Sequence, residues 1–299
     1  MPPTKRNAEE RLGAHVSTQG GVQTAPERGT AIGATAIQVF TKTPSQWKEP
    51  IIADAVAAGF RNLLTATDIR HVVSHDSYLI NLASPDQQLS ERSVTAFMAE
   101  LGRCRALGIP QVVSHPGNYI DHRNAGLERN ARNYTRALRQ VQGNVMILIE
   151  TTAGTGTALG ATFEELAALR EAIASDVRDR VGFCADTCHL YSAGYDLVND
   201  YEGVWRRWEA IVGLRHLGCL HLNDSKTPFG SRRDRHELIG QGSLGPDPFR
   251  RVMRDPRFAG IPKILETPKG DDLVANDRRM LRRLRAYARG NRVATDPLR

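Results

Sequence analysis

Six residues of the types that bind metal ions recur along the chain at intervals of 35 to 45 residues. Each is a histidine or a carboxylate, and each stands at or near the end of a short apolar run: His75, His115, Glu150, Asp186, His221 and Glu266. A single residue of this kind at a strand end usually serves only as a hydrogen-bonding group. Six of them in phase would repel one another and leave hydrogen bonds unmet if no metal were present. The spacing therefore predicts a shared metal site.

Three further candidates lie outside the strand ends. His189 follows Asp186 by three residues, and Asp234 and His236 stand two apart in a long polar loop from Asp224 to Pro248. Two residues at that spacing in an extended segment face the same way. Two imidazoles and one carboxylate leave one position of a tetrahedral zinc ion open, which is the arrangement found at catalytic zinc sites.

The mixture of ligand types favours zinc over magnesium or manganese. Five of the nine candidates are imidazoles, whereas barrel sugar isomerases bind their metals mostly through oxygen. Nine ligands are too many for one tetrahedral ion, and they fit three ions with three or four ligands each. Closely spaced metal ions stabilise the attacking and leaving oxygens of phosphoryl transfer. The residues therefore predict three zinc ions per chain and the hydrolysis of a phosphate ester.

The elements that must position these residues are eight strand-like runs with helical stretches between them. Short, continuous apolar runs are typical of strands buried on both faces of a parallel sheet. Eight such strands alternating with helices predict a single-domain α/β fold, the (β/α)8 TIM barrel, whose active sites lie at the carboxyl ends of the strands. A doubly wound open sheet is the alternative, but the first run lacks its glycine-rich phosphate turn. The predicted strands are Leu12–Ser17, Ala36–Thr41, His71–His75, Gln111–His115, Val145–Glu150, Val181–Asp186, Cys219–Asn223 and Lys263–Glu266.

Helical periodicity and capping residues predict four helices in particular. One over Glu91–Leu107 is ended by Gly108, and one over Thr162–Ala174 begins with a Thr-x-x-Glu capping box. Two more are expected over Arg129–Gln140 and Asp277–Ala288. We expect a flexible tail over residues 1–10, the barrel as catalytic domain over 11–288, and a second tail over 289–299.

Composition permits a nucleic-acid partner without proving one. The 299 residues carry a net charge of +7, which suits a polyanion but also arises from compositional bias. No apolar run is long enough to span a bilayer, so no membrane partner is expected. The four cysteines form no CxxC pair and are expected to be free thiols, which indicates a cytoplasmic protein.

The ligand motifs, taken in order, resemble those of the endonuclease IV family. The resemblance runs from about Leu12 to Glu266, and its motifs are highly specific in combination. They are Phe40-Thr41-Lys42, His75 to Leu82, His115-Pro116-Gly117, Glu150 to Gly154, Asp186-Thr187-Cys188-His189, His221 to Lys226, Asp234-Arg235-His236 and Leu265-Glu266-Thr267.

The resemblance implies how the nine residues divide among three zinc ions. His75, His115 and Glu150 would hold the first ion. The second would be held by Glu150, which bridges the two ions and is the expected catalytic residue, together with Asp186, His221 and Glu266. The third would be held by His189, Asp234 and His236.

The resemblance also implies the activity and the partner. Enzymes of this family are apurinic/apyrimidinic endonucleases of base excision repair. They are classified as deoxyribonuclease IV of the phage-T4-induced type. They cut the phosphodiester 5′ to an abasic site in duplex DNA, leaving 3′-hydroxyl and 5′-deoxyribose phosphate ends, and they trim blocked 3′ ends. A monomer is expected.

DNA contacts are expected from a loop, a tyrosine and several basic residues. The candidates are Gln46, Trp47, Tyr78, Lys226, Arg232, Arg233 and Arg235. The chain departs from the family's usual residues at Ser45, where an arginine is common, and at Thr151, where an asparagine is more usual. His15 is expected to lie behind the ligands rather than among them.

Two other functions are compatible with parts of this pattern. A barrel sugar isomerase or epimerase with a divalent metal shares the fold and some strand-end ligands, but it does not account for Asp234, His236 and the arginine-rich loop. A non-catalytic protein that binds damaged DNA would not require a complete set of ligands. A nicking assay on abasic duplex distinguishes both from an endonuclease.

Overall fold

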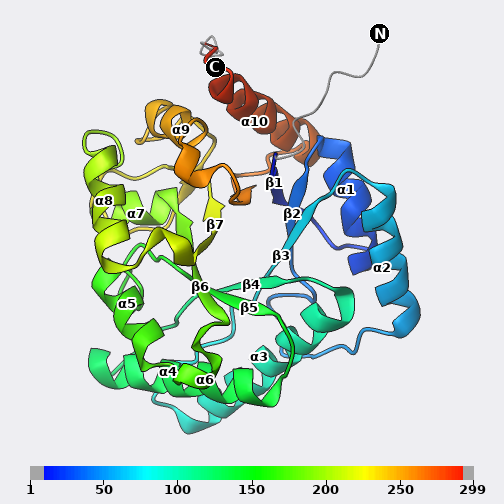
Figure 1. The fold of residues 1–299 in the computed structure, drawn as a ribbon, viewed down its shortest axis with the longest axis vertical. Helices are drawn as coiled ribbons and strands as arrows, with labels where there is room; N and C mark the ends of the chain where they lie inside the picture. Colours follow the sequence, from blue (N-terminus) through cyan, green and yellow to red (C-terminus); the bar gives the residue numbers. More distant parts are fainter. Residues whose placement is uncertain (1–9, 292–299) are drawn as a thin grey trace.

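The computed structural model describes residues 10–291, and in them eight parallel strands close into a barrel (Figure 1). The strands follow one another around the barrel in the order β1-β10-β7-β6-β5-β4-β3-β2. This confirms the predicted single-domain (β/α)8 barrel. The barrel strands are β1 (Leu12–His15), β2 (Ala36–Val39), β3 (His71–His75), β4 (Gln111–Ser114), β5 (Met146–Glu150), β6 (Val181–Asp186), β7 (Leu217–His221) and β10 (Lys263–Leu265).

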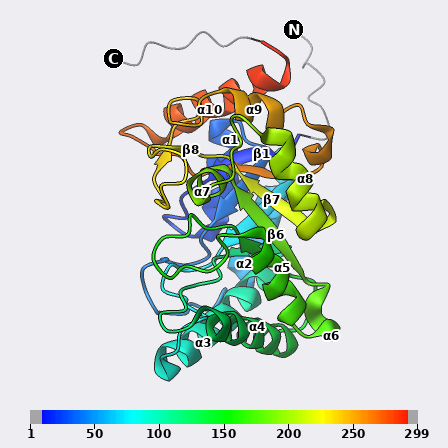
Figure 2. The same cartoon turned by 90° about the vertical axis from the view of Figure 1, so that its left-hand side faces the viewer.

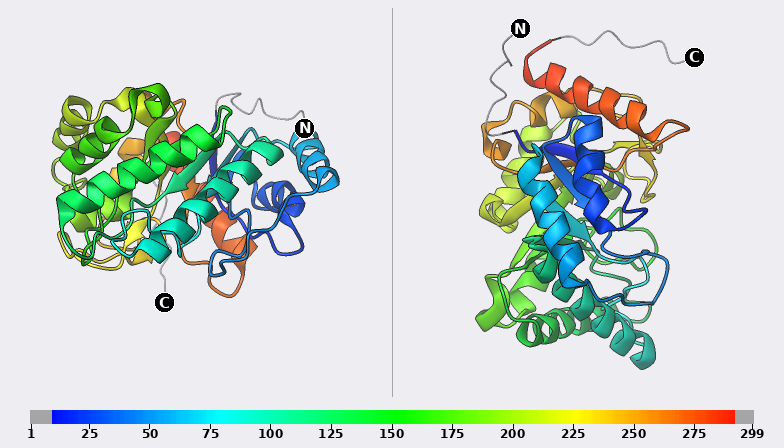
Figure 3. Two further views of the ribbon diagram at one scale, coloured as in Figure 1. Left: turned by 90° about the horizontal axis from the view of Figure 1, so that it is seen from below. Right: turned by 90° about the vertical axis from the view of Figure 1, so that its right-hand side faces the viewer.

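Helices form the outer ring of the barrel (Figures 1 and 2). Helix α10 packs against α1, so the last and first helices lie side by side and complete the ring (Figure 3). The helices are α1 (Ala25–Ile32), α2 (Asp54–Ala66), α3 (Gln87–Leu107), α4 (Arg123–Gln140), α5 (Phe163–Ala172), α6 (Ser175–Arg178), α7 (Thr187–Ala193), α8 (Tyr201–Ile211), α9 (Asp247–Val252) and α10 (Leu273–Ala288), with short 3-10 turns at Val22–Thr24, Leu214–His216 and Pro256–Phe258.

The barrel interior is filled by a layer of small and medium apolar side chains just below the strand ends. These residues form a cluster of their own inside the ring: Ala36, Val73, Val113, Leu148, Cys184, Cys219 and Ile264. Strand β1 contributes Gly13, because a Cβ atom there would lie 1.5 Å from the carbonyl oxygen of Ala36. Side chains two residues apart on a strand share a face. The residues two positions further along therefore also point into the barrel, at its carboxyl end.

Local signals set most of the predicted helix ends, although several predicted bounds differ. Gly108 ends α3 with φ +76°, a left-handed conformation that favours glycine. Thr162 caps α5 by accepting from the backbone N–H of Glu165, as the capping box predicts. The Glu165 carboxylate, however, accepts from Gly160 and Ala161 rather than from the cap residue. Helices α3, α4 and α10 each begin four to six residues earlier than predicted. The first turns of α3 and α4 are mostly polar and carry no apolar periodicity, whereas α10 begins with Leu273 and Val274, which are exposed.

The segment after β7 was predicted to be a loop, and it is more ordered than that. Strands β8 (Asp224–Ser225) and β9 (His236–Glu237) pair antiparallel within it. The Asp224 carboxylate anchors the segment by accepting hydrogen bonds from the backbone N–H groups of Ser225, Gly242 and Leu244. This short hairpin carries His236 to the carboxyl end of the barrel.

The tails predicted over residues 1–10 and 289–299 lie outside the described residues, except for Glu10 and residues 289–291. Glu10 pairs with Arg285 of α10 at 2.6 Å. Within residues 10–291, no helix has the length and apolar character needed to cross a membrane.

Candidate metal centre

Eight strand-end residues that point into the barrel meet above the apolar layer. Six of them are the predicted metal ligands, and His15 of β1 and Gln38 of β2 complete the ring. The sequence predicts the six ligands together because each occupies the same phase of the βα repeat. The structure brings all six together, and the three predicted ligands outside the strand ends join them.

Glu150 lies at the middle of this centre, and its side chain is fully buried. Its Oε2 atom is 3.2 Å from His75 Nε2 and 3.0 Å from His115 Nε2. Its Oε1 atom is 2.9 Å from His221 Nδ1. The two oxygens of one carboxylate thus face two different groups of ligands, which is the geometry of a bridging residue.

The second group consists of Glu150, Asp186, His221 and Glu266, whose ligand atoms all lie within 4.8 Å of one another. His221 Nδ1 is 3.1 Å from Glu266 Oε2 and 4.0 Å from Asp186 Oδ2. Asn223 holds two of these residues, because its side-chain amide donates to Asp186 Oδ2 and accepts from the backbone N–H of Glu266. This group offers oxygen ligands from three carboxylates and a nitrogen ligand from one imidazole. Zinc binds both kinds of ligand.

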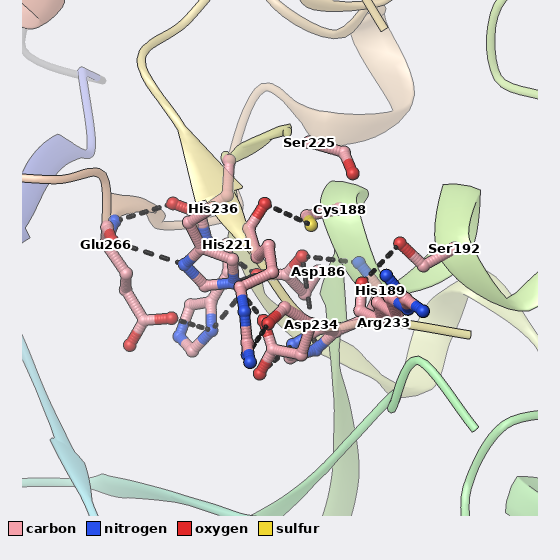
Figure 4. A network of polar contacts seen from close by, with 12 residues as sticks. Asp186, Cys188, His189, Ser192, His221, Ser225, Arg233, Asp234, His236 and Glu266 are labelled. Atoms are coloured by element: carbon pink, nitrogen blue, oxygen red, sulfur yellow. Dashed lines mark hydrogen bonds and ion pairs between the residues drawn. The ribbon is translucent and has the colours of Figure 1, made fainter. Parts of the chain in front are cut away.

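The third group is His189, Asp234 and His236, which come from α7 and the β8–β9 segment (Figure 4). Asp234 points one carboxylate oxygen at each histidine, at 3.2 Å from His189 Nε2 and 3.1 Å from His236 Nε2. Asp186 helps to place this group, because its Oδ1 caps α7 by accepting from the backbone N–H of His189. The predicted convergence of the loop pair with His189 is present in the structure.

Backbone carbonyls determine which nitrogen three of the histidines offer to the centre. The Nδ1 atoms of His75, His189 and His236 donate to the carbonyls of Asp76, Thr151 and Glu266 at 2.9, 2.8 and 3.2 Å. A carbonyl only accepts, so Nδ1 carries a hydrogen, and Nε2 is the nitrogen that faces the centre and is available to a metal ion.

Thr151 contributes a further contact. Its hydroxyl accepts from the backbone N–H of Asp186, so it links the end of β5 to β6 beside Glu150.

The donor atoms of the centre fit bound cations. The Nε2 atoms of His189 and His236 are buried and have no hydrogen-bond partner among the described residues. Burial opposes charge on the His75 imidazole, but the hydrogen bond and charge of Glu150 outweigh it and raise the pKa of His75 to about 9. Burial likewise opposes charge on His236, and Asp186 and Asp234 raise its pKa to about 9. The carboxylates thus create a potential that draws positive charge to this place.

The same balance appears on the acidic side of the centre. Burial alone would raise the pKa of Glu150, but the imidazoles of His221 and His115 hold it well below its usual value. The pKa of Asp234 is also lowered, because the adjacent imidazoles of His189 and His236 outweigh the effect of burial. Both groups are therefore carboxylates at neutral pH and available to metal ions.

A cleft of about 580 Å³ opens onto this centre. Three candidate ligands line it, His115, His189 and Asp234. The other lining residues are polar, basic or small: Asn118, Thr152, Ala153, Thr155, Ala158, Thr227, Arg233 and Arg235. A cleft lined by both candidate metal ligands and arginines can hold a phosphate group against the centre.

The residues predicted to contact DNA occupy different environments. Tyr78 is 71% exposed and packs its ring edge-on against Phe40 at 5.1 Å. Gln46 is exposed, whereas Trp47 is half-buried against the core, with the Arg92 guanidinium 4.4 Å above its ring. All four basic candidates are exposed: Lys226, Arg232, Arg233 and Arg235.

Hydrogen bonds link the loops around the mouth of the barrel. Ser77 donates to the Pro44 carbonyl, which joins the loops after β3 and β2. Asn81 exchanges two hydrogen bonds with the backbone of Asn118, which joins the loops after β3 and β4. Further bonds join Tyr119 to Thr157 and Thr155 to Arg232. These hydrogen bonds therefore connect the loops after β2, β3, β4, β5 and β7 at the rim of the site.

Three features of the site were not predicted from the sequence: Gln38, Asn223 and the role of the Thr151 carbonyl. Gln38 stands two residues after Ala36 of the interior layer, in the same phase as the ligands. That phase was the available signal. A glutamine is not a usual zinc ligand, so a search for ligand types passes over it.

Comparisons with known proteins agree with this geometry. Residues 27–284 match the family described as xylose isomerase-like TIM barrel. The chain is 47% identical over 284 residues to a protein named probable endonuclease 4 from Chloroflexus aurantiacus, covering 94% of this chain and 99% of that protein.

Solved structures with the same fold include an endonuclease and an epimerase-like protein. Endonuclease IV from Thermus thermophilus superposes with a TM-score of 0.84 at 38% identity, over 94% of this chain and all of that chain. A D-tagatose 3-epimerase-like protein superposes with a TM-score of 0.69 at 15% identity, over 94% of this chain and 99% of that chain. The second likeness shows the fold alone.

Proposed function

Because this chain belongs to the endonuclease IV family, we propose that it is a zinc-dependent endonuclease of DNA repair that cuts duplex DNA at abasic sites. It hydrolyses the phosphodiester 5′ to the abasic sugar and leaves a 3′-hydroxyl and a 5′-deoxyribose phosphate. It also trims blocked 3′ ends. The observation that carries the proposal is the convergence of nine ligand-type residues beside an arginine-lined cleft.

Three zinc ions per chain fit the three groups of residues. The first is held by His75, His115 and Glu150, the second by Glu150, Asp186, His221 and Glu266, and the third by His189, Asp234 and His236. When bound, zinc supplies Lewis-acid stabilisation of charge on a phosphate and makes water nucleophilic near neutral pH.

The protein's own residues orient the ligands and the substrate. Glu150 is the central catalytic residue, because its two carboxylate oxygens face two different groups of ligands. Arg233 and Arg235 attract the DNA backbone into the cleft, where two arginines offer donors for phosphate oxygens. Together with Lys226 and Arg232, they give the β8–β9 segment a basic outer surface.

Recognition of the lesion falls to the linked loops at the rim. Tyr78 and Gln46 are exposed there and can contact the bases beside an abasic nucleotide. The hydrogen bonds between the loops hold this surface in place before DNA arrives. Rotating a nucleotide out of the duplex costs least where its base is already missing, which favours an abasic site over intact DNA.

The proposed protein is a cytoplasmic monomer in which residues 11–288 form the catalytic domain. A sugar isomerase of the same fold would leave two features without a role. These are the third ligand group, with Asp234 and His236, and the basic residues beside it.

The experiment that tests the function uses a synthetic duplex with one abasic site and an end label. We expect a single cut 5′ to the site, with a 3′ end that a DNA polymerase extends. An intact duplex of the same sequence is the control and should remain uncut. Cleavage 3′ to the site, or no cleavage with turnover of a ketose instead, would overturn the proposal.

A further inference from the structure

His221 is held differently from the other buried histidines of the metal centre, and the meaning of this difference rests on the proposed function. His75, His189 and His236 donate from Nδ1 to a backbone carbonyl and turn Nε2 toward the ligands. His221 turns Nδ1 toward Glu150 and Glu266 instead. Its Nε2 faces the side chain of Gln38 at 2.7 Å. A side-chain amide thus takes the place that a backbone carbonyl takes elsewhere in the centre.

The surroundings of Gln38 fix the orientation of its amide. The side chain is fully buried at the end of β2. Its Nε2 donates to Glu266 Oε1 at 2.6 Å. The Glu266 carboxylate only accepts, so the amide nitrogen must face it and the amide oxygen must face His221. The oxygen also only accepts, so His221 carries a hydrogen on Nε2, which leaves Nδ1 as the nitrogen available to a metal ion.

The second hydrogen of the amide nitrogen is also used. It points to His15 Nδ1 at 3.1 Å, and the His15 ring packs against Phe40 with 4.3 Å between the ring centres. His15 and Glu266 therefore hold Gln38 from two sides. Because the donors and the acceptor of the amide each have a partner, rotating the amide by 180° would set its oxygen against the Glu266 carboxylate, which only accepts.

We propose that Gln38 is a positioning residue that holds His221 and Glu266 in the geometry required by the second zinc ion. One amide fixes the tautomer of the histidine and the orientation of the carboxylate. His221 and Glu266 come from different strands, β7 and the end of β10, so Gln38 also sets their separation. Substituting residues that hold metal ligands in this way typically weakens metal binding or activity by about 10- to 100-fold.

The test is Gln38→Met, which keeps the length and bulk of the side chain and removes its hydrogen bonds with His221, Glu266 and His15. Zinc retained per chain is measured during titration with a competing chelator. The matched control is Gln88→Met, because Gln88 is exposed on α3. We expect one zinc ion of three to be lost at about 10- to 100-fold lower chelator strength, with the other two unchanged. Imidazole ¹⁵N spectra should show that His221 no longer carries its hydrogen on Nε2 alone. The value of kcat should fall while KM for abasic duplex stays constant.

Retention of all three ions at wild-type chelator strength, with an unchanged His221 spectrum, would overturn this inference and leave the proposed function intact. Failure of the wild-type protein to bind zinc would instead contradict the proposed function. If Gln38→Met does not fold, Gln38→Glu takes its place. That variant accepts from His221 but places a second carboxylate beside Glu266. It should keep the His221 tautomer and lose the same zinc ion, and undiminished retention would again overturn the inference.

Discussion

Glu150 offers the most direct test at the scale of one residue. Its oxygens lie 3.0 Å from His115 on one side and 2.9 Å from His221 on the other. An amide in this place lacks the charge that attracts two cations. We expect Glu150→Gln to lower abasic cleavage at least about 1,000-fold, which corresponds to ~4 kcal/mol of transition-state stabilisation. The variant should fold, as measured by circular dichroism.

The matched control for this substitution is Glu128→Gln, since Glu128 is exposed on α4 and its pairing partner Arg132 is 3.9 Å away. It should cleave as the wild type does, because surface ion pairs contribute little. Cleavage by Glu150→Gln within a few-fold of wild type would show that Glu150 does not bridge two metal ions.

Tyr78, Gln46 and Trp47 are predicted to contact DNA, and their surroundings separate them. Tyr78 and Gln46 are exposed, so Tyr78→Ala and Gln46→Ala should lower the preference for abasic over intact duplex about tenfold without changing Tm. Trp47 packs against the core beneath Arg92. Trp47→Ala should therefore lower Tm by several degrees in addition to any effect on DNA.

Competition binding with abasic and intact duplexes measures the preference, and zinc content is the control. Ser45→Arg should bind at least as well as wild type, because an arginine there can reach a gap that a serine cannot fill. If Gln46→Ala and Tyr78→Ala both keep the full abasic preference, the recognition surface lies elsewhere.

Residue types in phase with the barrel repeat predict the six strand-end ligands, because strand geometry alone brings them together. The same phase does not identify Gln38, since its amide contacts the candidate ligands His221 and Glu266 and, on our proposal, would act on a metal ion only through them. Nor does the sequence show that Trp47 stacks beneath Arg92 of α3, 45 residues away, because that contact depends on tertiary packing.

At the scale of elements, the eight barrel strands are predictable to within a few residues, because buried parallel strands are short apolar runs. The β8–β9 hairpin is not predictable in this way. Each of its strands has two residues, too few for a periodic pattern, and its order depends on the buried Asp224 carboxylate. Helices α1, α2 and α8 are likewise not among those predicted in particular.

Helix α3 holds the loop after β2 through a buried polar network centred on Arg103. Arg103 donates to Thr41, Glu49 and Glu100 at 2.6 to 2.7 Å, and its side chain is 3% exposed. Arg103→Met leaves the Glu100 carboxylate buried without its cation. We expect the free energy of unfolding to fall by about 3 kcal/mol, measured by urea denaturation.

The control on the same helix is Arg105→Met. Arg105 is exposed and contacts a single backbone carbonyl, so its loss should change the stability by less than about 0.5 kcal/mol. Equal effects of the two substitutions would mean that the network does not stabilise the loop.

At the scale of the whole molecule, the net charge is +7, and some of the basic residues behind it lie beside the candidate metal centre. Arg233 and Arg235 line the cleft beside the metal centre. Each phosphate contact should contribute about −0.9 to the slope of log K against log salt for duplex binding. We expect Arg233→Ala to reduce the magnitude of that slope by about 0.9. Arg282→Ala, on the exposed face of α10, should leave it unchanged. Binding that does not depend on salt would mean that the charge is only compositional.

Abasic DNA is cut, on our proposal, with zinc held by the nine converging residues of this barrel. The most direct measurement is nicking of abasic duplex by protein from which a strong chelator has removed all metal. Activity should disappear with the metal and return in proportion to added zinc, reaching its maximum near three ions per chain, while magnesium alone restores none. Full activity in the metal-free protein, or restoration by magnesium in the verified absence of zinc, would contradict the proposal.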